Sequence, residues 1–402
     1  MYKKYKRIFL IVLDSVGIGG AIDEKEFGDI NVNTLLHTLE VTNGKLPHLE
    51  KMGLMNLINN QDSESDSYYT RAICQSCGKD TLTGHLEMMG VLTTKPLKTF
   101  TETGFPKELI QELEEKTGRK VIGNISASGT EIIEKLGKEH METGAIIVYT
   151  SADSVLQIAA HEDIIPLDEL YKICEIARNI TLKDEWKVGR IIARPFIGQP
   201  GNFTRTANRH DYALDPPSKT TLDVLKENNF DVLAIGKISD IFNNCGITKS
   251  VKTKDNLDGI LKIEEALKED FTGLCFANLN DFDSKYGHRR NPSGYMNALL
   301  EVDNNIDNIK NNLNDDDLLI ITADHGNDPT YQGSDHTREN TPVLIYNKNF
   351  KNPTRLPNLK TFADLGATIA DNFNLSSFLG TSFLESLKWI FKQPGIKKNI
   401  KN

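Results

Sequence analysis

The stretch RIFLIVLDSVGIGG, residues 7–20, carries the first indication of the fold class. Its apolar residues 8–13 form an uninterrupted run, which is typical of a strand buried on both faces of a parallel sheet. The run ends at Asp14, and a glycine-rich loop follows. Ligands of open α/β sheets bind beyond the carboxyl ends of the strands, so Asp14 stands where a functional side chain is expected.

Similar short apolar runs recur along the chain and alternate with helical patterns. They predict further buried parallel strands at 231–235, 273–279, 318–322 and 342–346. Apolar spacing predicts helices at 221–228 and 296–312, and it extends the helical prediction over the Asn- and Asp-rich segment 302–317. This alternation predicts an α/β fold whose central, mostly parallel sheet is flanked by helices.

The middle of the chain differs from the two ends. Between about 96 and 217 polar loops are more frequent, and strands are expected at 145–150 and 190–194. The pair Pro216–Pro217 suits a linker that returns the chain to its first domain. We therefore expect a core domain from 1–95 and 218–402, with a smaller α/β cap domain, 96–217, inserted into it.

Composition excludes several classes of function. The chain has 402 residues and a net charge of −9, so we expect no nucleic-acid partner held by phosphate contacts. It has no uninterrupted apolar stretch of the length that a membrane span requires, so no membrane partner is expected either. Five cysteines do not form a disulfide framework, and a cytoplasmic location is expected.

Aspartate and histidine residues follow three of the predicted strands. They are Asp14 after the first, Asp281, Asp283 and His288 after 273–279, and Asp324, His325, Asp328, Asp335 and His336 after 318–322. These side chains should gather at one edge of the sheet, where they suit a pair of divalent cations such as Mn²⁺, Zn²⁺ or Mg²⁺. Taken singly, such an Asp is more often a turn or helix cap. Together they indicate a two-metal site, which can clamp both oxygens of a phosphoryl transfer.

The segment GKDTLTGHLEMMG, residues 78–90, places hydroxyl groups before a predicted helix. A hydroxyl at a helix N-terminus lies at the positive end of the dipole, and Thr81 could serve there as a nucleophile toward phosphorus. Asp80 or Thr81 could equally cap the helix, and capping and catalysis are compatible.

Two other motifs fail as cofactor sites. Gly17 and Gly19 resemble the start of a dinucleotide fingerprint, but Ile22 stands where the third glycine should fall. Cys74 and Cys77 form a CxxC without a second such pair, so we interpret them as ordinary thiols.

The motifs together resemble the phosphopentomutase family of the alkaline phosphatase superfamily, in order and over nearly the whole chain. They are LDSVGIG, GKDTLTGH, SADSV, DFDSKYGHRR, TADHGNDPT and GSDHTRENTPVL. The resemblance implies an alkaline-phosphatase-like core and interconversion of ribose 1-phosphate and ribose 5-phosphate, and of the 2-deoxy forms. It also implies a phosphoenzyme and a sugar 1,5-bisphosphate, which serves as activator.

The resemblance further implies roles for particular residues. Asp14, Asp324 and His325 would bind one Mn²⁺, and Asp283, His288 and His336 the other. Thr81 would be the phosphorylated nucleophile. Ser151, Asp153 and Arg194 would contact the substrate from the cap, and Lys237 from the core.

Three alternatives stay open at this point. A phosphoglycerate mutase or a plain phosphatase could use the same core, although a phosphoglycerate mutase of this superfamily would carry Ser in place of Thr81. A non-catalytic protein that binds metal or sugar phosphate is the alternative of another class. The cluster Arg205, Arg209 and His210 fits either the phosphate that is not transferred or a network of ion pairs at a hinge.

Overall fold

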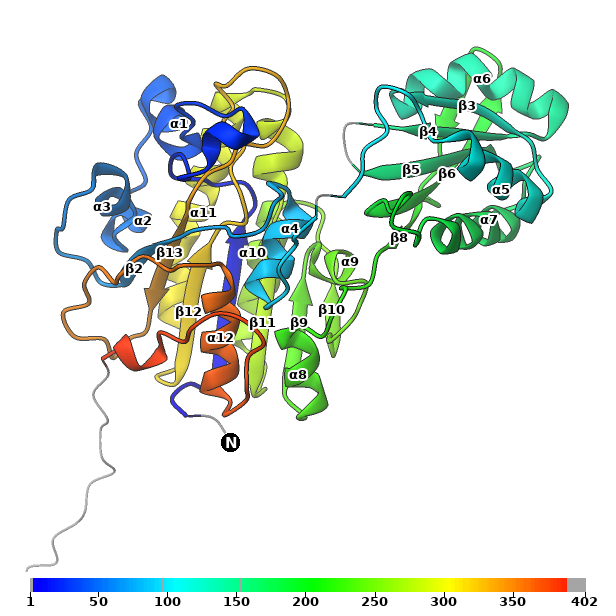
Figure 1. Ribbon diagram of the computed structural model, residues 1–402. Helices are drawn as coiled ribbons and strands as arrows, with labels where there is room; N and C mark the ends of the chain where they lie inside the picture. The colour runs from blue at the N-terminus through cyan, green and yellow to red at the C-terminus, as the bar shows by residue number, and fades with distance from the viewer. Residues whose placement is uncertain (1–2, 96, 152–153, 389–402) are drawn as a thin grey trace, which may run out of the picture. The chain divides into compact units, whose positions relative to one another are not determined.

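The computed structural model describes residues 3–95, 97–151 and 154–388, and Figure 1 shows their arrangement. The chain divides into two compact units. The larger comprises Met1–Thr94 and Pro216–Asn402, and the smaller is the inserted segment Lys95–Asp215. The predicted boundaries at 96 and 217 lie close to these, and the role of the smaller unit as a substrate-recognition cap stays a prediction.

The larger unit is built on a seven-stranded sheet. Its order is β10 (Lys249–Val251), β9 (Asp231–Ile235), β11 (Gly273–Leu279), β1 (Arg7–Leu13), β12 (Asp317–Thr322), β13 (Thr341–Tyr346) and β2 (Tyr68–Ala72). The five strands from β10 to β12 in this order are parallel to one another. Every residue of β1 is buried, because alternate side chains enter two different apolar cores.

Helices cover both faces of this sheet. One face carries α4 (Thr81–Met88), α8 (Thr221–Glu227) and α12 (Ala363–Asn372), which lie nearer the viewer in Figure 1. The other carries α1 (Thr34–Thr42), α2 (Pro47–Lys51), α10 (Asn256–Leu267) and α11 (Pro292–Asn312). The remaining helices of this unit are the short α3 (Leu54–Asn59) and α9 (Ile238–Ile241). The predicted α/β fold with a central sheet between helices is confirmed.

Two details of the prediction are wrong. Strand 342–346 was expected to be parallel, but β13 runs antiparallel to both β12 and β2. An apolar run indicates that a strand is buried, but it does not indicate whether the strand is parallel or antiparallel to its neighbours. Residues 323–340 connect β12 to β13 without a crossover helix. The helix expected over 302–317 ends at Asn312, because Asp317 begins β12 and pairs with Arg7.

The smaller unit has its own six-stranded sheet. Its strands are β3 (Val121–Ser126), β4 (Ile146–Thr150), β5 (Val155–His161), β6 (Arg190–Gln199) and β7 (Asn202–Arg205), with β8 (His210–Ala213) also paired to β6. The helices α5 (Lys107–Thr117) and α7 (Leu167–Ile180) pack on one apolar core, and α6 (Gly129–Thr143) on another. The strands expected at 145–150 and 190–194 are β4 and the first half of β6.

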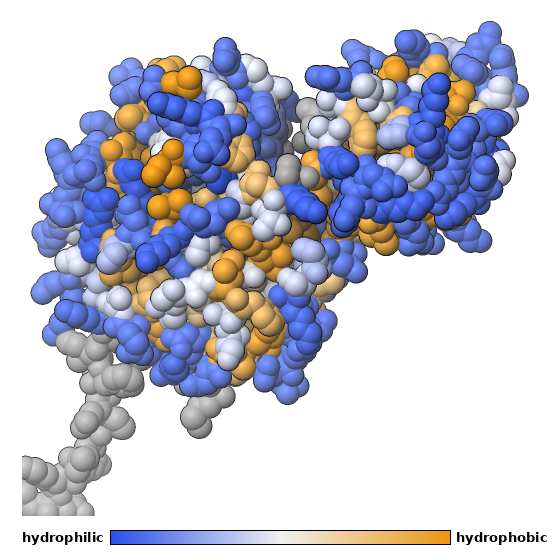
Figure 2. All heavy atoms as spheres, viewed as in Figure 1, coloured by the Kyte–Doolittle hydropathy of each residue, from blue (hydrophilic) through white to orange (hydrophobic). Residues whose placement is uncertain are grey.

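Hydrophilic side chains cover most of the face shown in Figure 2, with smaller hydrophobic areas over part of the larger unit. None of the helices in the described part of the chain combines the length and the apolar character that crossing a bilayer requires.

A buried ion pair joins the starts of β1 and β12. Arg7 donates to both carboxylate oxygens of Asp317, at 2.8 and 2.6 Å, and Arg7 and Asp317 are 2% and 0% exposed. Arg7 also donates to the backbone carbonyls of Leu267, the last residue of α10, and of Glu269, which lies two residues further along the chain. The pair therefore ties three elements at the edge of the sheet opposite the strands' carboxyl ends.

Replacing Arg7 by Met should destabilise the protein by about 3–5 kcal/mol, because the Asp317 carboxylate would stay buried without its partner. Urea unfolding measures the change. Lys6→Met is the matched control: Lys6 pairs with the exposed Asp270, and its loss should have no comparable effect. Equal stability of the Arg7→Met variant and the wild type would show that the pair does not organise this edge.

Candidate metal centre

The carboxyl ends of β1, β11 and β12 lie side by side, because β1 pairs with both other strands in parallel register. Asp14 follows β1 directly, and Asp324 and His325 come two and three residues after Thr322, the last residue of β12. Asp283 lies on the π-helical segment Phe282–Gly287 that follows β11. The strand order therefore brings together the side chains that the sequence pattern placed at one edge.

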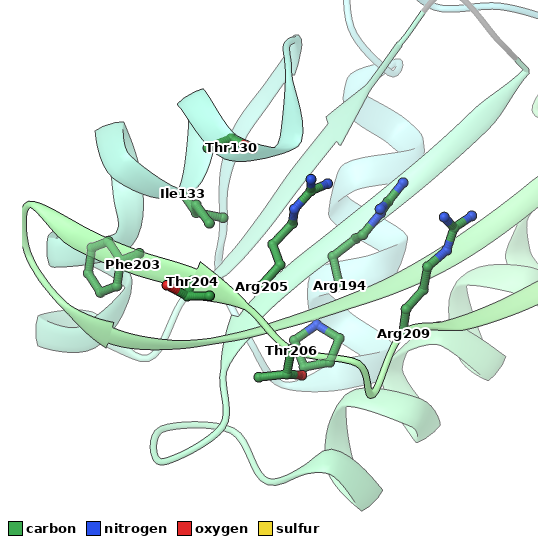
Figure 3. Close-up of a pocket in the computed structure, with 9 residues that line it drawn as sticks. Thr130, Ile133, Arg194, Phe203, Thr204, Arg205, Thr206 and Arg209 are labelled. Atoms are coloured by element: carbon green, nitrogen blue, oxygen red, sulfur yellow. The ribbon is translucent and has the colours of Figure 1, made fainter. Parts of the chain in front are cut away.

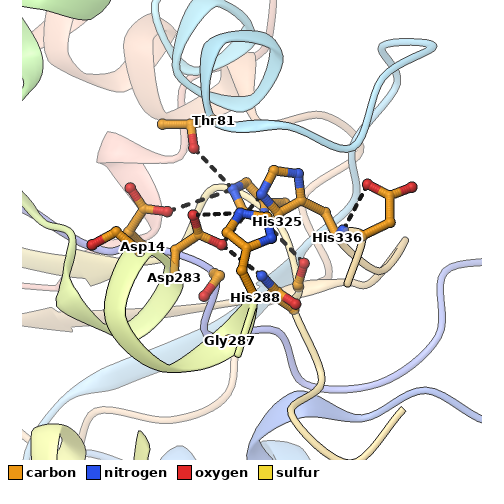
Figure 4. A network of polar contacts seen from close by, with 12 residues as sticks. Asp14, Thr81, Asp283, Gly287, His288, His325 and His336 are labelled. Atoms are coloured by element: carbon orange, nitrogen blue, oxygen red, sulfur yellow. Dashed lines mark hydrogen bonds and ion pairs between the residues drawn. The ribbon is translucent and has the colours of Figure 1, made fainter. Parts of the chain in front are cut away.

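Two groups of side chains have the spacing that a metal ion requires. Asp14, Asp324 and His325 form one group, and Asp283, His325 and His336 form the other. Within each group the ligand atoms lie within 4.8 Å of one another, and every member is buried. His325 belongs to both groups, and Figure 4 shows Asp14, Asp283 and His336 close to it.

His288 is placed differently from the expectation. The resemblance pairs it with Asp283 and His336, whereas the second compact group contains His325 instead. The His288 Nε2 lies 3.2 Å from Asp283 Oδ2, and its ring lies 4.6 Å from the His336 ring. His288 therefore borders the second group, and its role as a metal ligand stays a prediction.

The other strand-end carboxylates lie outside both groups. Asp328 is buried but accepts hydrogen bonds from Asn33 and Thr330 and contacts His37. Asp281 accepts from the backbone of Asn256 at the start of α10. Asp335 is exposed. These residues support local backbone structure.

The carboxylates and histidines of the site shift one another's pKa values. Burial and the charges of Asp324 and Asp283 raise the pKa of Asp14. Burial alone would lower the pKa of His325, but the surrounding carboxylates, that of Asp324 foremost, outweigh it and raise the pKa to about 9. Burial opposes ionisation of Asp283, but nearby histidines led by His336 hold the pKa of its carboxyl well below its usual range.

Buried polar atoms without a hydrogen bond give a second test of whether these residues suit metal ions. Asp14 Oδ1, Asp324 Oδ2 and His336 Nε2 are buried and make no well-aligned hydrogen bond to any described residue. Buried polar atoms are almost always satisfied, so three such atoms in one cluster indicate a missing partner. Carboxylate oxygens and imidazole nitrogens at this spacing are ligands of Mn²⁺, Zn²⁺ and Mg²⁺ sites. The residues present therefore fit a pair of divalent cations.

Hydrogen bonds outside the groups aim these ligands. Asn278 and Asn280 donate to Asp14 Oδ2 at 2.9 and 3.0 Å, which leaves Oδ1 facing the cluster. The backbone N–H of Ser15 donates to Asp324 Oδ1 at 2.9 Å. Ser15 has a φ of 72°, a left-handed conformation that side chains other than glycine rarely adopt and that is often retained at functional sites. The sequence analysis missed Asn278 and Asn280, although both lie at the end of a predicted strand.

Thr81 is the first residue of α4, and its hydroxyl lies 3.1 Å from His325 Nε2. Asp80 caps the helix by accepting from the Thr83 N–H, and the role of Thr81 as a nucleophile stays a prediction. His85 donates through Nδ1 to the Thr81 carbonyl at 2.9 Å, and the same nitrogen lies 3.2 Å from Asp324 Oδ2. A Cβ on Gly84 would lie 2.3 Å from the Asp324 carbonyl oxygen, so glycine lets α4 approach this closely.

Arg338 fixes the loop that precedes Thr81. Its guanidinium donates to the carbonyls of Gly78 and Cys74, at 2.7 and 2.8 Å, and pairs with Asp23. Arg338 follows His336 by two residues, so one buried side chain connects the loop before Thr81 with the segment that carries His336. Cys74 and Cys77 are free thiols, as expected, and burial raises the pKa of Cys74.

The glycines after Asp14 make room for a buried carboxylate. A Cβ on Gly17 would lie 2.4 Å from Glu339 Oε2. Glu339 accepts hydrogen bonds from the Gly19 N–H and from the hydroxyls of Thr34 and Thr337. The loop thus anchors the segment that carries His336.

The predicted substrate-binding residues are spread over both units. Lys237 follows β9 in the larger unit and is exposed. Its positive charge lowers the pKa of Asp14, but by less than burial and the neighbouring carboxylates raise it. Ser151 follows β4, and Arg194 lies in β6, where its Nε donates to Gln157 at 3.1 Å. Asp153 lies outside the described residues.

The wild-type protein, reconstituted with Mn²⁺ and desalted, should hold two ions per chain, and Asp283→Asn should reduce this to one. The substitution removes an anionic ligand from one group only. Elemental analysis by mass spectrometry counts the ions. Asp335→Asn is the control and should keep both, because Asp335 belongs to neither group. A single ion in the wild type, or two in Asp283→Asn, would contradict the assignment.

Comparisons with known proteins agree with a metal centre. The profile of the metalloenzyme superfamily matches residues 6–377. Among solved structures, the chain is similar to phosphoglycerate mutase from Leishmania mexicana, with a TM-score of 0.50, 13% identity, and coverage of 94% of this chain and 98% of that one. It is also similar to the PH0037 protein from Pyrococcus horikoshii, with a TM-score of 0.49, 14% identity, and coverage of 94% and 100%. These likenesses concern the fold alone. The match over residues 6–377 shows that the chain belongs to the metalloenzyme superfamily.

Proposed function

We propose that this protein is a phosphopentomutase that interconverts ribose 1-phosphate and ribose 5-phosphate, and their 2-deoxy forms, through phosphorylated Thr81. The observation that carries the proposal is the Thr81 hydroxyl, which lies 3.1 Å from His325 Nε2 at the meeting point of the two candidate metal groups. The motifs that resemble the phosphopentomutase family supply the pentose specificity.

The position of Thr81 suits phosphoryl transfer. As the first residue of α4, it lies at the positive end of the helix dipole, which favours a phosphoryl group there. Two divalent cations, Mn²⁺ in this proposal, would be held by Asp14, Asp324 and His325 and by Asp283, His288 and His336, and would stabilise charge on the transferring oxygens.

The reaction needs two transfers. Phosphothreonine gives its phosphoryl group to a free hydroxyl of the sugar monophosphate, which yields the 1,5-bisphosphate. The other phosphoryl group of the bisphosphate then returns to Thr81. Each transfer moves one phosphoryl group between the Thr81 oxygen and a sugar oxygen, and one proton moves in the opposite direction. Added sugar 1,5-bisphosphate is therefore expected to activate dephosphorylated protein.

Other residues hold the sugar phosphate in this proposal. Lys237 from the larger unit and Ser151, Asp153 and Arg194 from the smaller one would contact it, because the intermediate must be retained while it turns. Exclusion of water during that step would prevent hydrolysis of the phosphothreonine. We propose the cytoplasm as the location, supported by five cysteines that form no disulfide with one another among the described residues.

One alternative has an observation in its favour. The Leishmania protein of similar fold is a phosphoglycerate mutase, so the same core could act on phosphoglycerates. A threonine at position 81 favours the pentose assignment over it. A protein that only binds metal or sugar phosphate would have no need of a hydroxyl so close to both metal groups.

Thr81→Val should lower mutase turnover at least about a thousandfold, because valine keeps the shape of threonine but has no nucleophilic oxygen. A coupled assay of ribose 1-phosphate and ribose 5-phosphate interconversion measures the loss. Peptide mass spectrometry should find a phosphoryl group on Thr81 in the wild type. Thr143→Val, at an exposed helix end, should behave as wild type. Intact turnover in Thr81→Val would refute the nucleophile assignment.

A further inference from the structure

Arg290 is the second arginine of the YGHRR motif, and it belongs to neither of the two candidate metal groups. It lies between the π-helical segment that carries Asp283 and Pro292, the first residue of α11. Its φ is 50°, a left-handed conformation that residues other than glycine rarely adopt and that persists only where the surroundings hold it. The conformation points to a constraint on where this side chain must lie.

The guanidinium group of Arg290 holds together the loop that leads to His336. Residues 328–335 are all described and contain no helix or strand. Arg290 donates to the backbone carbonyls of four of them at distances from 2.6 to 3.4 Å, namely Asp328, Gln332, Gly333 and Asp335. Asp335 directly precedes His336, so Arg290 holds the backbone beside a candidate metal ligand.

Arg290 also reaches Asp283, through the buried amide of Asn327. Arg290 Nη1 donates to Asn327 Oδ1 at 2.5 Å, and Asn327 Nδ2 donates to Asp283 Oδ1 at 2.7 Å. An arginine can only donate hydrogen bonds, so Arg290 fixes the direction of the amide and turns its Nδ2 toward the carboxylate. Asn327 is 0% exposed, and a Cβ on Gly287 would lie 2.7 Å from its Nδ2, so glycine leaves room for the amide.

The hydrogen bond from Asn327 constrains how Asp283 faces the other ligands. The same oxygen, Asp283 Oδ1, lies 3.2 Å from His336 Nε2. In the first group, Asn278 donates to Asp14 in a similar way, so each group contains a carboxylate that accepts from a buried side-chain amide. Partners of this kind orient metal ligands, and their loss typically lowers metal affinity by about 10–100-fold.

All three guanidinium nitrogens of Arg290 are engaged within the larger unit. Nε makes one hydrogen bond, Nη1 three and Nη2 two, all to oxygen atoms of the protein. By contrast, Arg194, Arg205 and Arg209 line a pocket of about 470 Å³ in the smaller unit, and Figure 3 shows their guanidinium groups pointing to the same side. Arg290 is therefore placed to orient other residues and not to bind an anion.

We propose that Arg290 is the positioning residue of the group formed by Asp283, His325 and His336 (the second group), and that it sets the affinity of one of the two ions. It orients Asp283 through Asn327 and holds the backbone before His336. Its hydrogen bonds to described residues include none to the ligands that belong to the first group alone. The proposal concerns the metal centre and does not depend on which substrate the protein converts.

Calorimetric titration of the metal-free full chain with Mn²⁺ tests the proposal, because it measures the affinities of both ions. Arg290→Met keeps much of the length of the side chain but none of its donors, and it should weaken one ion about 10–100-fold while the other is unchanged. Asn327→Leu has a similar shape and no amide, and it should weaken the same ion. Arg290→Lys keeps one donor group and should lie between Arg290→Met and the wild type.

Asp283→Asn identifies which ion is affected, because Asp283 belongs to the second group alone. Adding Arg290→Met to Asp283→Asn should leave the affinity of the remaining ion unchanged. The double variant Arg290→Met/Asn327→Leu should lose less binding free energy than the two single variants together, since both act on one carboxylate. Arg289→Met is the matched control: Arg289 is exposed and donates to the Lys285 carbonyl at 3.1 Å, so both ions should bind as in the wild type.

Equal weakening of both ions in Arg290→Met would show that the arginine supports the fold in general, and unchanged affinities would show that it does not act on the site. Either result overturns the proposal, as would a wild type that binds fewer than two ions. If Arg290→Met does not fold, as judged by circular dichroism, Asn327→Leu and Arg290→Lys give the same test. Mn²⁺ binding is measured without substrate, so failure of the proposed mutase reaction would leave these results unaffected.

Discussion

Asp14, Asp283 and Asp324 are buried around the His325 ring, where their negative charges repel one another. Burying a carboxylate without compensation costs several kcal/mol, so this arrangement persists only where cations and hydrogen-bond donors surround it. Asn278, Asn280 and the Ser15 N–H satisfy the outer oxygens of Asp14 and Asp324. Asp14 Oδ1 and Asp324 Oδ2 accept no well-aligned hydrogen bond from a described residue, and both belong to a group that would hold a cation.

This need for cations explains the arrangement of the neighbouring elements. Parallel strands β11, β1 and β12 are adjacent, so their carboxyl ends deliver the ligands to one place. Gly84 lets α4 approach Asp324, which places Thr81 beside His325. The buried side chains of Arg338 and Glu339 hold the loop before Thr81 and the segment that carries His336. A hydroxyl at a helix N-terminus beside two metal groups is an arrangement suited to accepting a phosphoryl group.

Much of the sheet and of the candidate site could be predicted because the ends of buried strands can be recognised in the sequence. Apolar runs located β1, β9, β11, β12 and β13, and the residues after them included every member of the two compact groups. The direction of β13 could not be predicted, because burial alone produces the same apolar run in either direction. The sequence did not predict the supporting roles of Asn278, His85 and Arg338. Each of these side chains acts through contacts with distant segments, and such contacts leave no distinctive spacing in the sequence.

The most direct test of the account is the choice of substrate. The Mn²⁺-loaded protein, supplied with a catalytic amount of sugar bisphosphate, is assayed for isomerisation of ribose 5-phosphate and of 3-phosphoglycerate under the same conditions. We predict conversion of ribose 5-phosphate to ribose 1-phosphate, with little release of inorganic phosphate and no isomerisation of 3-phosphoglycerate. Isomerisation of 3-phosphoglycerate alone, or hydrolysis without isomerisation, would contradict it.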